Sequence, residues 1–515
     1  MPKPAVWHNE PECGHDVTCA YQTHYCTYIR VPRLLTLQNP QTPDPSTLPS
    51  VAGQAPDRLL LITAHQWHEL WFKVLLADLR AALAASSTLP SVAEQAPTYE
   101  PVKLLKRGIE LFKLFEHHAD VCETIIVREL GLKKDVRVPA ERVTGASGQF
   151  TQLAALFRQL PRLSRTAAAG QRGGGYTYPG LWEAAEEYAA RFKAFRARYQ
   201  KFLKATLIPH PERSAVERRA VEGYAGWLRL PDLLSLQDGV KAAWTEVGQP
   251  PAALMPTENM SADENMFVVV HQCFEIWFKV VLDHVDRALP LVLSGKIAEA
   301  TRLLRRVVLI QRLLVQQIQI PATMLPLDFL RFRDQRLERD GKVFKTGLSP
   351  ASGTESYQFR EIEIVCGLRD DPVFQKYLKG TDKLPIRLLT PRQRERLQQT
   401  TLPEAFRQAA RQRGLQTFDE IFTPADVPNP HADLARLADT LIEFDEFFRF
   451  WRFGHVSMVE KMIGAKSGTG FLGPEYLMET AGIRIQEKNR VFEEKQVRPR
   501  FFEELWAVRT RMSSY

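Results

Sequence analysis

A nine-residue frame occurs twice in this chain of 515 residues, and this repeat most constrains the fold. The first copy, at 65–73, reads His-Gln-Trp-His-Glu-Leu-Trp-Phe-Lys, and the second, at 271–279, reads His-Gln-Cys-Phe-Glu-Ile-Trp-Phe-Lys. Six of the nine positions are identical at an offset of 206 residues. A histidine opens each copy, so the repeat also marks two candidate functional segments.

Two further landmarks repeat in the same order. The segment 25–38 matches 224–237 at seven of fourteen positions, and 144–148 is similar to 349–353 at an offset of 205 residues. A repeat this long indicates a duplicated domain, because solenoid units have periods of about 20–50 residues.

The turn that best separates the two copies lies at 208–214, where two prolines follow each other closely. Proline interrupts helices and marks loops. We therefore expect two domains, at 1–212 and 213–515.

The expected fold class is all-α. Apolar residues recur at helical spacing through most of the chain, as at 303–314, whereas alternating strand patterns are scarce. A charged excursion at 334–347 is expected to link two helices. The sequence thus predicts two tandem helical bundles.

The distribution of charge and the length of the apolar segments limit whether this chain can bind nucleic acid or span a membrane. The 68 Lys and Arg residues stand against 60 Asp and Glu residues and are spread along the chain, which favours a solvated surface over a nucleic-acid footprint. The most apolar segment, 266–285, carries His271, Glu275, Lys279 and Asp283, so we expect no membrane span. The first residues have no apolar run suited to secretion, which predicts a cytoplasmic protein.

One interpretation of the N-terminal cysteines and histidines is a metal site. Cys13, His15, Cys19, His24 and Cys26 are ligand types that suit zinc, but their spacings fit no common zinc finger. Free thiols near a terminus are the other interpretation, and six cysteines in all argue against a disulfide scaffold.

Two histidines of the second copy stand among bulky apolar residues. His271 shares a helical face with Phe267, and His455 follows Trp451 in the long helix predicted at 433–463. Each could be a buried core histidine or could point into a pocket. A neutral imidazole among apolar side chains also suits a haem iron.

The second copy resembles the tryptophan 2,3-dioxygenases and related haem-dependent aromatic oxygenases. The resemblance rests on motifs that follow one another in family order: His-Gln-x-x-Glu-x-Trp-Phe-Lys at 271–279, Pro-Leu-Asp-Phe-Leu-Arg-Phe-Arg-Asp at 326–334, Ser-Pro-Ala-Ser-Gly at 349–353, Trp-Arg-x-x-His at 451–455, Ile-Gly-x-Lys-x-Gly-Thr-Gly at 463–470, and Phe-Phe-x-Glu-Leu-Trp-x-Val-Arg-Thr at 501–510. It covers nearly all of the second copy.

The resemblance implies a haem b cofactor and a role for each site residue. His455 is expected to be the proximal iron ligand, and His271 the catalytic distal histidine that hydrogen-bonds the substrate ring nitrogen or the oxygen species. Phe267 and Phe329 are expected to line the aromatic pocket. Arg333 has the planar fork that suits a substrate carboxylate.

Four more substrate-binding residues follow from the same resemblance. Thr469 is expected to meet the ammonium group of the substrate, and Ser352 to orient His271. In this family a Tyr-x-x-Tyr segment reaches into the active site of a neighbouring subunit. We expect Tyr25 and Tyr28 of the first copy to enter the pocket of the second copy in the same chain.

The first copy is expected to be a degenerate, supporting domain. Tyr199 aligns with His455, Leu61 replaces the pocket phenylalanine, and the chain turns at Pro209 without a Gly-Thr-Gly loop. Tyrosine can ligate ferric haem, so haem binding by the first copy stays open. In the second copy, the run at 468–473 and the excursion after Arg333 depart from the family pattern on the substrate side.

The function that the resemblance implies is a haem-dependent dioxygenase. It would act with O2 on L-tryptophan or a related indole, cleaving the C2–C3 bond to an N-formylkynurenine-type product of tryptophan catabolism. The alternatives are hydroxylation of an indole or a tyrosine-like phenol, and a non-catalytic haem-binding or scaffold protein. Relatives assemble as tetramers of single copies, which implies a homodimer for a duplicated chain.

Overall fold

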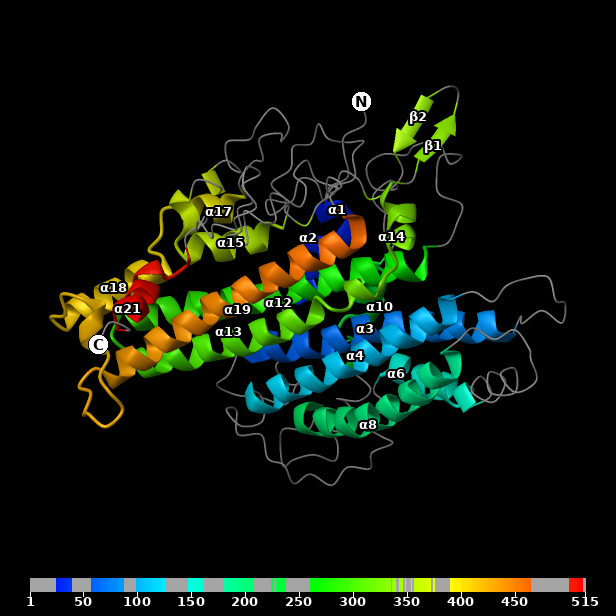
Figure 1. Ribbon diagram of the computed structural model, residues 1–515, viewed down its shortest axis with the longest axis horizontal. Helices are drawn as coiled ribbons and strands as arrows, with labels where there is room; N and C mark the ends of the chain where they lie inside the picture. Colours follow the sequence, from blue (N-terminus) through cyan, green and yellow to red (C-terminus); the bar gives the residue numbers. More distant parts are fainter. Residues whose placement is uncertain are drawn as a thin grey trace, which may run out of the picture.

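The computed structural model is almost entirely helical, and long helices run side by side along its length (Figure 1). It describes residues 25–38, 57–87, 99–125, 147–161, 180–207, 224–226, 228–237, 260–334, 336–339, 342–345, 348, 353, 356–371, 374–375, 390–464 and 500–512. The expected all-α class is confirmed.

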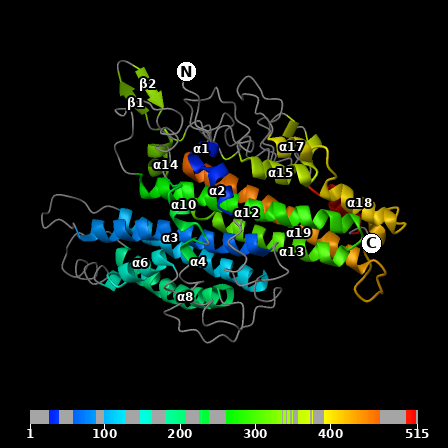
Figure 2. The same ribbon diagram turned by 180° about the vertical axis from the view of Figure 1, so that it is seen from behind.

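Helices from the first part of the chain form one side of the molecule in both views (Figures 1 and 2). They are α3 (Asp57–Ser87), α4 (Glu100–Cys122), α6 (Gly148–Phe157) and α8 (Leu181–Leu207), and they are preceded by the short helices α1 (Tyr25–Ile29) and α2 (Val31–Thr36). Helix α4 packs between α3 and α8, and α6 packs on α3.

Except for α10, which packs on α3, the later elements form the other side, together with α1 and α2. The later elements are α10 (Leu230–Leu234), α12 (Ala262–Leu293), α13 (Ile297–Gln317), η4 (Pro321–Thr323), α14 (Pro326–Arg333), β1 (Arg336–Arg339), β2 (Lys342–Lys345), α15 (Tyr357–Val365), η6 (Leu368–Asp370), α17 (Pro391–Arg396), α18 (Leu402–Gln412), η7 (Phe418–Ile421), α19 (Ala432–Ile463) and α21 (Glu503–Met512). Helix α13 packs between α12 and α19, and α12 also packs on α3.

Helix α12 is the centre of the molecule and carries His271. It begins at Ser261, whose hydroxyl accepts a hydrogen bond from the Glu264 amide, and Asp263 and Glu264 complement the helix dipole in its first turn. The helix is long and apolar enough to cross a membrane by composition alone, yet 83% of its most apolar window is buried inside the protein. Its apolar surface is therefore used for the core.

The expected charged excursion contains a small antiparallel hairpin of β1 and β2, with Arg336 opposite Lys345 and Arg339 opposite Lys342. Sequence analysis missed it because four-residue strands are too short for a clear alternating pattern. The two residues between the strands, Asp340 and Gly341, form the dipeptide most typical of a two-residue hairpin loop.

The two halves interlock through the segments that precede the histidine frames. The Gln66 side-chain amide donates to the carbonyls of Leu37 and Leu228, each over 3.1 Å. The Gln272 amide donates to Leu236 over 2.9 Å and to Ile29 over 3.0 Å. Each glutamine thus binds one segment from its own half and one from the other half.

The lysines that end the two nine-residue frames also bind carbonyl groups of the other half. Lys73 donates to the Leu234 carbonyl and Lys279 to the Leu35 carbonyl, each over 2.7 Å. Helices α1 and α2 accordingly pack on α12, whereas α10 packs on α3. The domain boundary expected at 212 and 213 lies outside the described residues and stays a prediction.

The third repeated landmark, at 144–148, aligns with a different segment of the second copy from the one expected. Ser147 caps α6 and Ser356 caps α15, and each hydroxyl accepts from the amide three residues later. The Gln149 amide donates to Glu69, and the Gln358 amide donates to Glu275. Ser147 therefore corresponds to Ser356 and not to Ser352. The shared Ser-x-Gln-Phe pattern was the signal that sequence analysis overlooked.

Candidate functional site

His271 lies in the third turn of α12 and holds a defined tautomer. Its Nδ1 is 2.7 Å from the Phe267 carbonyl oxygen, which can only accept a hydrogen bond. Burial lowers the pKa of His271 to about 4, an effect that this hydrogen bond partly opposes. A neutral ring with its proton on Nδ1 leaves a lone pair on Nε2, so His271 presents a hydrogen-bond acceptor.

His455 lies on α19 and is also neutral at physiological pH. Burial lowers its pKa to about 4, and repulsion from a charge on His271 contributes. The two imidazoles therefore lie within electrostatic reach of each other. The Trp451 ring stacks on His455 at 5.4 Å and 21°. Both histidines are only half-buried.

Aromatic rings from the first half contact His271 and Phe267. The Tyr25 ring meets His271 edge-on, with centroids 5.8 Å apart and an angle of 72°. Tyr28 lies 6.4 Å from the Phe267 ring, and Phe267 lies 4.4 Å from His271. Tyr28 also donates to Glu264 over 3.3 Å. The structure thus brings Tyr25, Tyr28, Phe267 and His271 together.

Helix α14 adds the next wall. Proline at its first position and Asp328 in its first turn suit a helix start. The Phe329 and Phe332 rings lie 5.6 Å and 5.5 Å from the Phe267 ring. Arg333 ends the helix and is buried. Phe329 and Arg333 therefore belong to the helix that faces Phe267.

Ser352 and Thr469 lie outside the described residues. Gly353, which follows Ser352, is described, and a Cβ atom built on it would lie 4.0 Å from His271 Nε2. The chain therefore passes beside the acceptor nitrogen of His271 next to the expected position of Ser352.

The residues present fit a haem group. An axial ligand needs a neutral imidazole, and His455 is neutral. Within the described residues, its only ring contact is the stacking with Trp451, and no hydrogen bond occupies its nitrogens. Gly454, beside it, lets α19 approach Ile318 so closely that a Cβ atom would lie 3.2 Å from Ile318 Cγ2. The donor and the aromatic walls match what a flat apolar macrocycle requires.

Sequence analysis assigned no site role to Glu275, but the structure places it in a polar network beside His271 and Tyr25. Glu275 is fully buried one turn after His271 and accepts from the Tyr25 hydroxyl over 2.9 Å and from the Gln358 amide over 2.7 Å. Burial raises the pKa of Glu275, whereas hydrogen bonds from Ser356, Gln358 and Tyr25 oppose the rise. The repeated Glu in both nine-residue frames was the available signal.

The corresponding region of the first half is filled with side chains. Tyr199 packs against His68, Phe72 and Phe150 at centroid distances of 5.0, 5.1 and 4.9 Å. In the second half it is Trp451 that packs against the corresponding Phe274, Phe278 and Phe359, at 5.6, 6.3 and 5.2 Å.

Tyr199 therefore corresponds to Trp451 and not to His455, which corrects the sequence alignment by one helical turn. The residue at the His455 position is Leu203, four residues after Tyr199, and it is fully buried. The Phe202 ring lies 4.9 Å from His65, in the space beside the distal position. A leucine cannot ligate iron, and the neighbouring phenylalanine occupies the volume that a macrocycle would need.

Metal binding through the N-terminal cysteines and histidines stays untested, because Cys13, His15, Cys19 and His24 lie outside the described residues. Cys26 is buried in α1. The part of the chain that the structure describes holds no group of three His, Cys, Asp or Glu residues placed to bind a metal ion.

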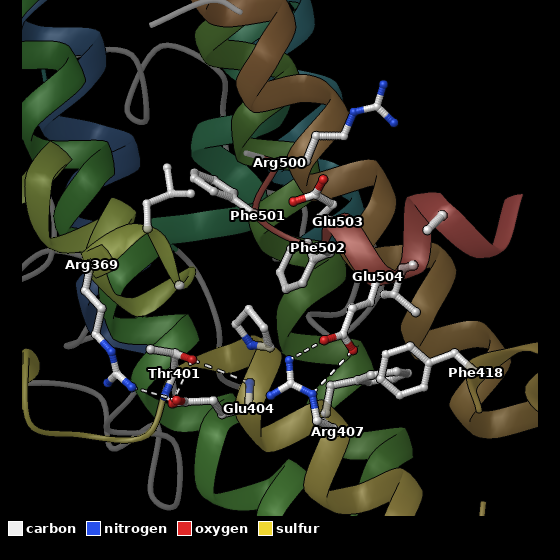
Figure 3. Close-up of a pocket in the computed structure, with 16 residues that line it drawn as sticks. Arg369, Thr401, Glu404, Arg407, Phe418, Arg500, Phe501, Phe502, Glu503 and Glu504 are labelled. Atoms are coloured by element: carbon white, nitrogen blue, oxygen red, sulfur yellow. Dashed lines mark hydrogen bonds and ion pairs between the residues drawn. The ribbon is translucent and has the colours of Figure 1, made fainter. Parts of the chain in front are cut away.

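A separate cleft lies among η6, α18, η7 and α21, and neither His271 nor His455 lines it (Figure 3). Its three arginines are balanced by three glutamates, and Arg369 contacts Glu404 while Arg407 contacts Glu504, each over 2.6 Å. A cleft whose lining charges are already matched has no evident excess charge for a charged ligand.

Long helices that bring two neutral imidazoles together among aromatic rings form a helical protein suited to a planar cofactor and an aromatic substrate. A family model described as tryptophan 2,3-dioxygenase matches residues 252–423. The chain belongs to this family of haem-dependent enzymes, and the predicted dioxygenase class is confirmed.

Three relatives, each named tryptophan 2,3-dioxygenase, show how the match is distributed. The protein of Nocardioides sp. is 34% identical over 264 residues, which cover 49% of this chain and 86% of that relative. The Herpetosiphon aurantiacus protein is 30% identical over 303 residues, covering 56% and 96%. The Caulobacter vibrioides protein is 31% identical over 270 residues, covering 48% and 90%. A nearly complete relative therefore matches about half of this chain.

Proposed function

We propose that this chain is a haem-dependent dioxygenase that cleaves the C2–C3 bond of L-tryptophan or a close indole relative to an N-formylkynurenine-type product. Family membership supports the reaction class. The observation that carries the proposal is the pair of neutral imidazoles, His271 and His455, which lie within electrostatic reach of each other and are flanked by aromatic rings.

His455 is the residue that would hold haem b, because its imidazole is neutral and its ring nitrogens are available within the described residues. Haem, when bound, supplies the activation of dioxygen. Trp451 fixes the plane of the imidazole by stacking on it. The contact between Gly454 and Ile318 fixes the rotation of α19 against α13, which sets the direction of the His455 side chain.

His271 would orient the substrate ring. Its Nε2 carries a lone pair, because Nδ1 donates to the Phe267 carbonyl. An indole N–H is a donor and matches this acceptor. A hydrogen bond of this kind places the indole with its reactive edge at a constant angle and retains the proton on the indole nitrogen until the reaction begins.

Different residues would bind the carboxylate and ammonium groups of the substrate and form the walls of the pocket. Arg333 would pair with the carboxylate of an amino acid, and Thr469 would meet its ammonium group. Phe267, Phe329, Tyr25 and Tyr28 would surround the ring and exclude water. Ser352 would lie near His271, since the adjacent Gly353 passes beside Nε2.

The first half would act as a supporting domain that lends Tyr25 and Tyr28 to the pocket. Their contacts with His271 and Phe267 support this assignment. One chain would then contain the equivalent of two family subunits, and two chains would form a homodimer that resembles the family tetramer. A homodimer and a cytoplasmic location are part of the proposal, and light scattering on the purified protein tests the first of these.

The decisive experiment uses the full chain reconstituted with haem and mixed with L-tryptophan in air, followed by mass spectrometry of the product. A gain of two oxygen atoms supports cleavage, a gain of one supports the alternative hydroxylase, and haem loading without turnover supports a non-catalytic haem protein. His455→Ala should abolish the Soret band, and His117→Ala, at an exposed histidine on α4, should leave it unchanged. Full haem loading of His455→Ala would overturn the ligand assignment.

A further inference from the structure

A buried cation of the first half joins the two helices that carry the substrate-facing residues. Lys103, on α4, is only 2% exposed, and its ammonium group lies 2.7 Å from Asp263 of α12 and 2.7 Å from Asp328 of α14. A third carboxylate, Glu100, lies 2.6 Å away on α4 itself. One ammonium group therefore connects three helices.

Arg107, one turn further along α4, extends this contact. Its guanidinium is fully buried and contacts Asp263 as well as Asp78 of α3, the latter over 3.3 Å. It also donates to Thr323 Oγ1 of η4 over 3.1 Å. Asp263 is thus held by two cations from α4, whereas Asp328 receives only Lys103 from that helix.

The two aspartates occupy equivalent places in their helices. Each lies in a first turn, where a carboxylate also complements the helix dipole. Asp263 precedes Phe267 by one helical turn, and Asp328 directly precedes Phe329. The Phe267 and Phe329 rings meet at 5.6 Å, so the separation of the two helix starts also sets the width of the aromatic wall.

Lys103 is the group that keeps these carboxylates together. Burial lowers its pKa, but the ion pairs and hydrogen bonds with Asp263, Asp328 and Glu100 outweigh that effect and raise it to about 12. It therefore stays charged throughout the physiological range. Without the ammonium group, Asp263 and Asp328 would repel each other across a region from which water is largely excluded.

Helix α14 packs on α19 and α12, but within the described residues its first turn is weakly buried. Leu325 and Leu327, which flank its first proline, are 39% and 74% exposed, so apolar burial contributes little there. The helix has only eight residues and ends at Arg333. A displacement of its first turn would therefore be transmitted to the arginine at its end.

We propose that Lys103 is a positioning residue of the first half that sets the affinity of the second-half pocket for the carboxylate of an aromatic amino acid, by holding α14 and hence Arg333 against α12. This inference rests on the proposed function, which assigns the substrate carboxylate to Arg333. It gives the first half a second role besides the two tyrosines, since α4 carries none of the proposed site residues.

The test compares Lys103→Met with the wild-type holoenzyme. Methionine keeps the length and apolar stem and removes the charge. We expect the Kd for L-tryptophan, measured from the haem spectrum, to rise by about tenfold or more, because a charged hydrogen bond contributes about 1.5–3 kcal/mol. The Kd for tryptamine, which lacks the carboxylate, should change much less. Haem content should stay the same.

The control is Lys113→Met, on the same helix. Lys113 also pairs with a carboxylate, Glu110, over 2.7 Å, but it is 41% exposed. Lys113→Met should leave the Kd for L-tryptophan and the Kd for tryptamine unchanged. Lys103→Arg should recover part of the affinity, because it keeps the charge. An equal loss of affinity for L-tryptophan and tryptamine would overturn the inference, since it would indicate general destabilisation.

Hydrogen exchange provides a readout that does not depend on activity. Lys103→Met should increase amide exchange in α14 and leave exchange in α19 unchanged. Unchanged protection of α14 would overturn the positioning role. If Lys103→Met fails to fold, Asp328→Asn replaces one charged acceptor of Lys103 with a neutral one and leaves the ion pair with Asp263, and the same two measurements apply. If the wild-type protein binds haem but not L-tryptophan, the proposed function fails, and exchange in α14 still decides whether Lys103 positions the helix.

Discussion

The Tyr25 hydroxyl donates a 2.9 Å hydrogen bond to Glu275, which lies 250 residues later in the chain. The mirror contact also exists, because the Tyr224 hydroxyl donates to Glu69 over 3.1 Å. Each half thus supplies a tyrosine to the histidine helix of the other half, but in the first half Leu203 stands at the position that corresponds to His455. This pairing provides a matched comparison within one molecule.

Tyr25→Phe should destabilise the protein and weaken substrate binding. It removes a donor from a buried carboxylate, a change that costs about 1–3 kcal/mol. Chemical denaturation measures the stability, and spectral titration with L-tryptophan measures binding. Tyr224→Phe should have a similar effect on stability and none on binding. If both variants bind L-tryptophan equally weakly, the first half does not contribute selectively to the pocket.

The chain should bind one haem, although it contains two histidine frames. Leu203 occupies the position that corresponds to His455, and Phe202 packs on His65 at 4.9 Å. The measurement is haem content per chain after reconstitution and removal of excess hemin. His65→Ala should retain one haem per chain. A stoichiometry of two would contradict the filled first site.

Acid should destabilise the first half through its buried histidines. Burial lowers the pKa of His68 to about 3, although a hydrogen bond with Ala64 partly opposes the change. Below pH 6.5 the unfolded chain binds a proton at this residue that the folded protein does not bind. The free energy of unfolding therefore falls as the pH decreases from about 6.5 to 3, by at most about 1.4 kcal/mol per pH unit from this residue.

His68→Phe, which copies Phe274 of the second half, should move the acid unfolding midpoint to lower pH. Circular dichroism at decreasing pH checks this shift. His117→Phe serves as the control because His117 is exposed on α4. An unchanged midpoint in His68→Phe would show that other groups dominate acid unfolding.

Gly454→Ala should disturb haem binding even though glycine contacts no ligand. The added Cβ atom would lie 3.2 Å from Ile318 Cγ2, which is closer than ordinary van der Waals contact. Helix α19 must then shift or rotate by a few tenths of an ångström beside His455. We expect a weaker or displaced Soret band. Ile318→Ala removes the opposing methyl group, so the double variant should recover the wild-type spectrum. If the double variant is no better than Gly454→Ala, the cause lies elsewhere.

The sequence predicted the helical class because it depends on local patterns. Apolar spacing along α12 and α13 reports the buried faces of helices directly. The family motifs assigned site roles to His271, Phe267, Phe329 and His455, and the structure brings the first three of these together.

The alignment of the two copies with each other was harder to predict than the helices themselves. Tyr199 and His455 each lie near the end of a long helix, and their alignment shifted by one turn because Arg-rich helical segments look alike at neighbouring offsets. The equivalence of Ser147 with Ser356 was missed for a related reason. A short motif can match at two positions, and only the bonds to Glu69 and Glu275 distinguish them.

By itself the sequence determined which helices form, which faces they bury and which family the chain resembles, because these properties follow from side-chain chemistry at regular spacing. The tertiary structure decided which imidazoles are neutral, which aromatic rings lie beside His271 and how the halves are connected. The state of His271, the crossing of Tyr25 to Glu275 and the junction at Lys103 all depend on distances between residues far apart in the chain. Burial and charge at such junctions arise only when the helices pack.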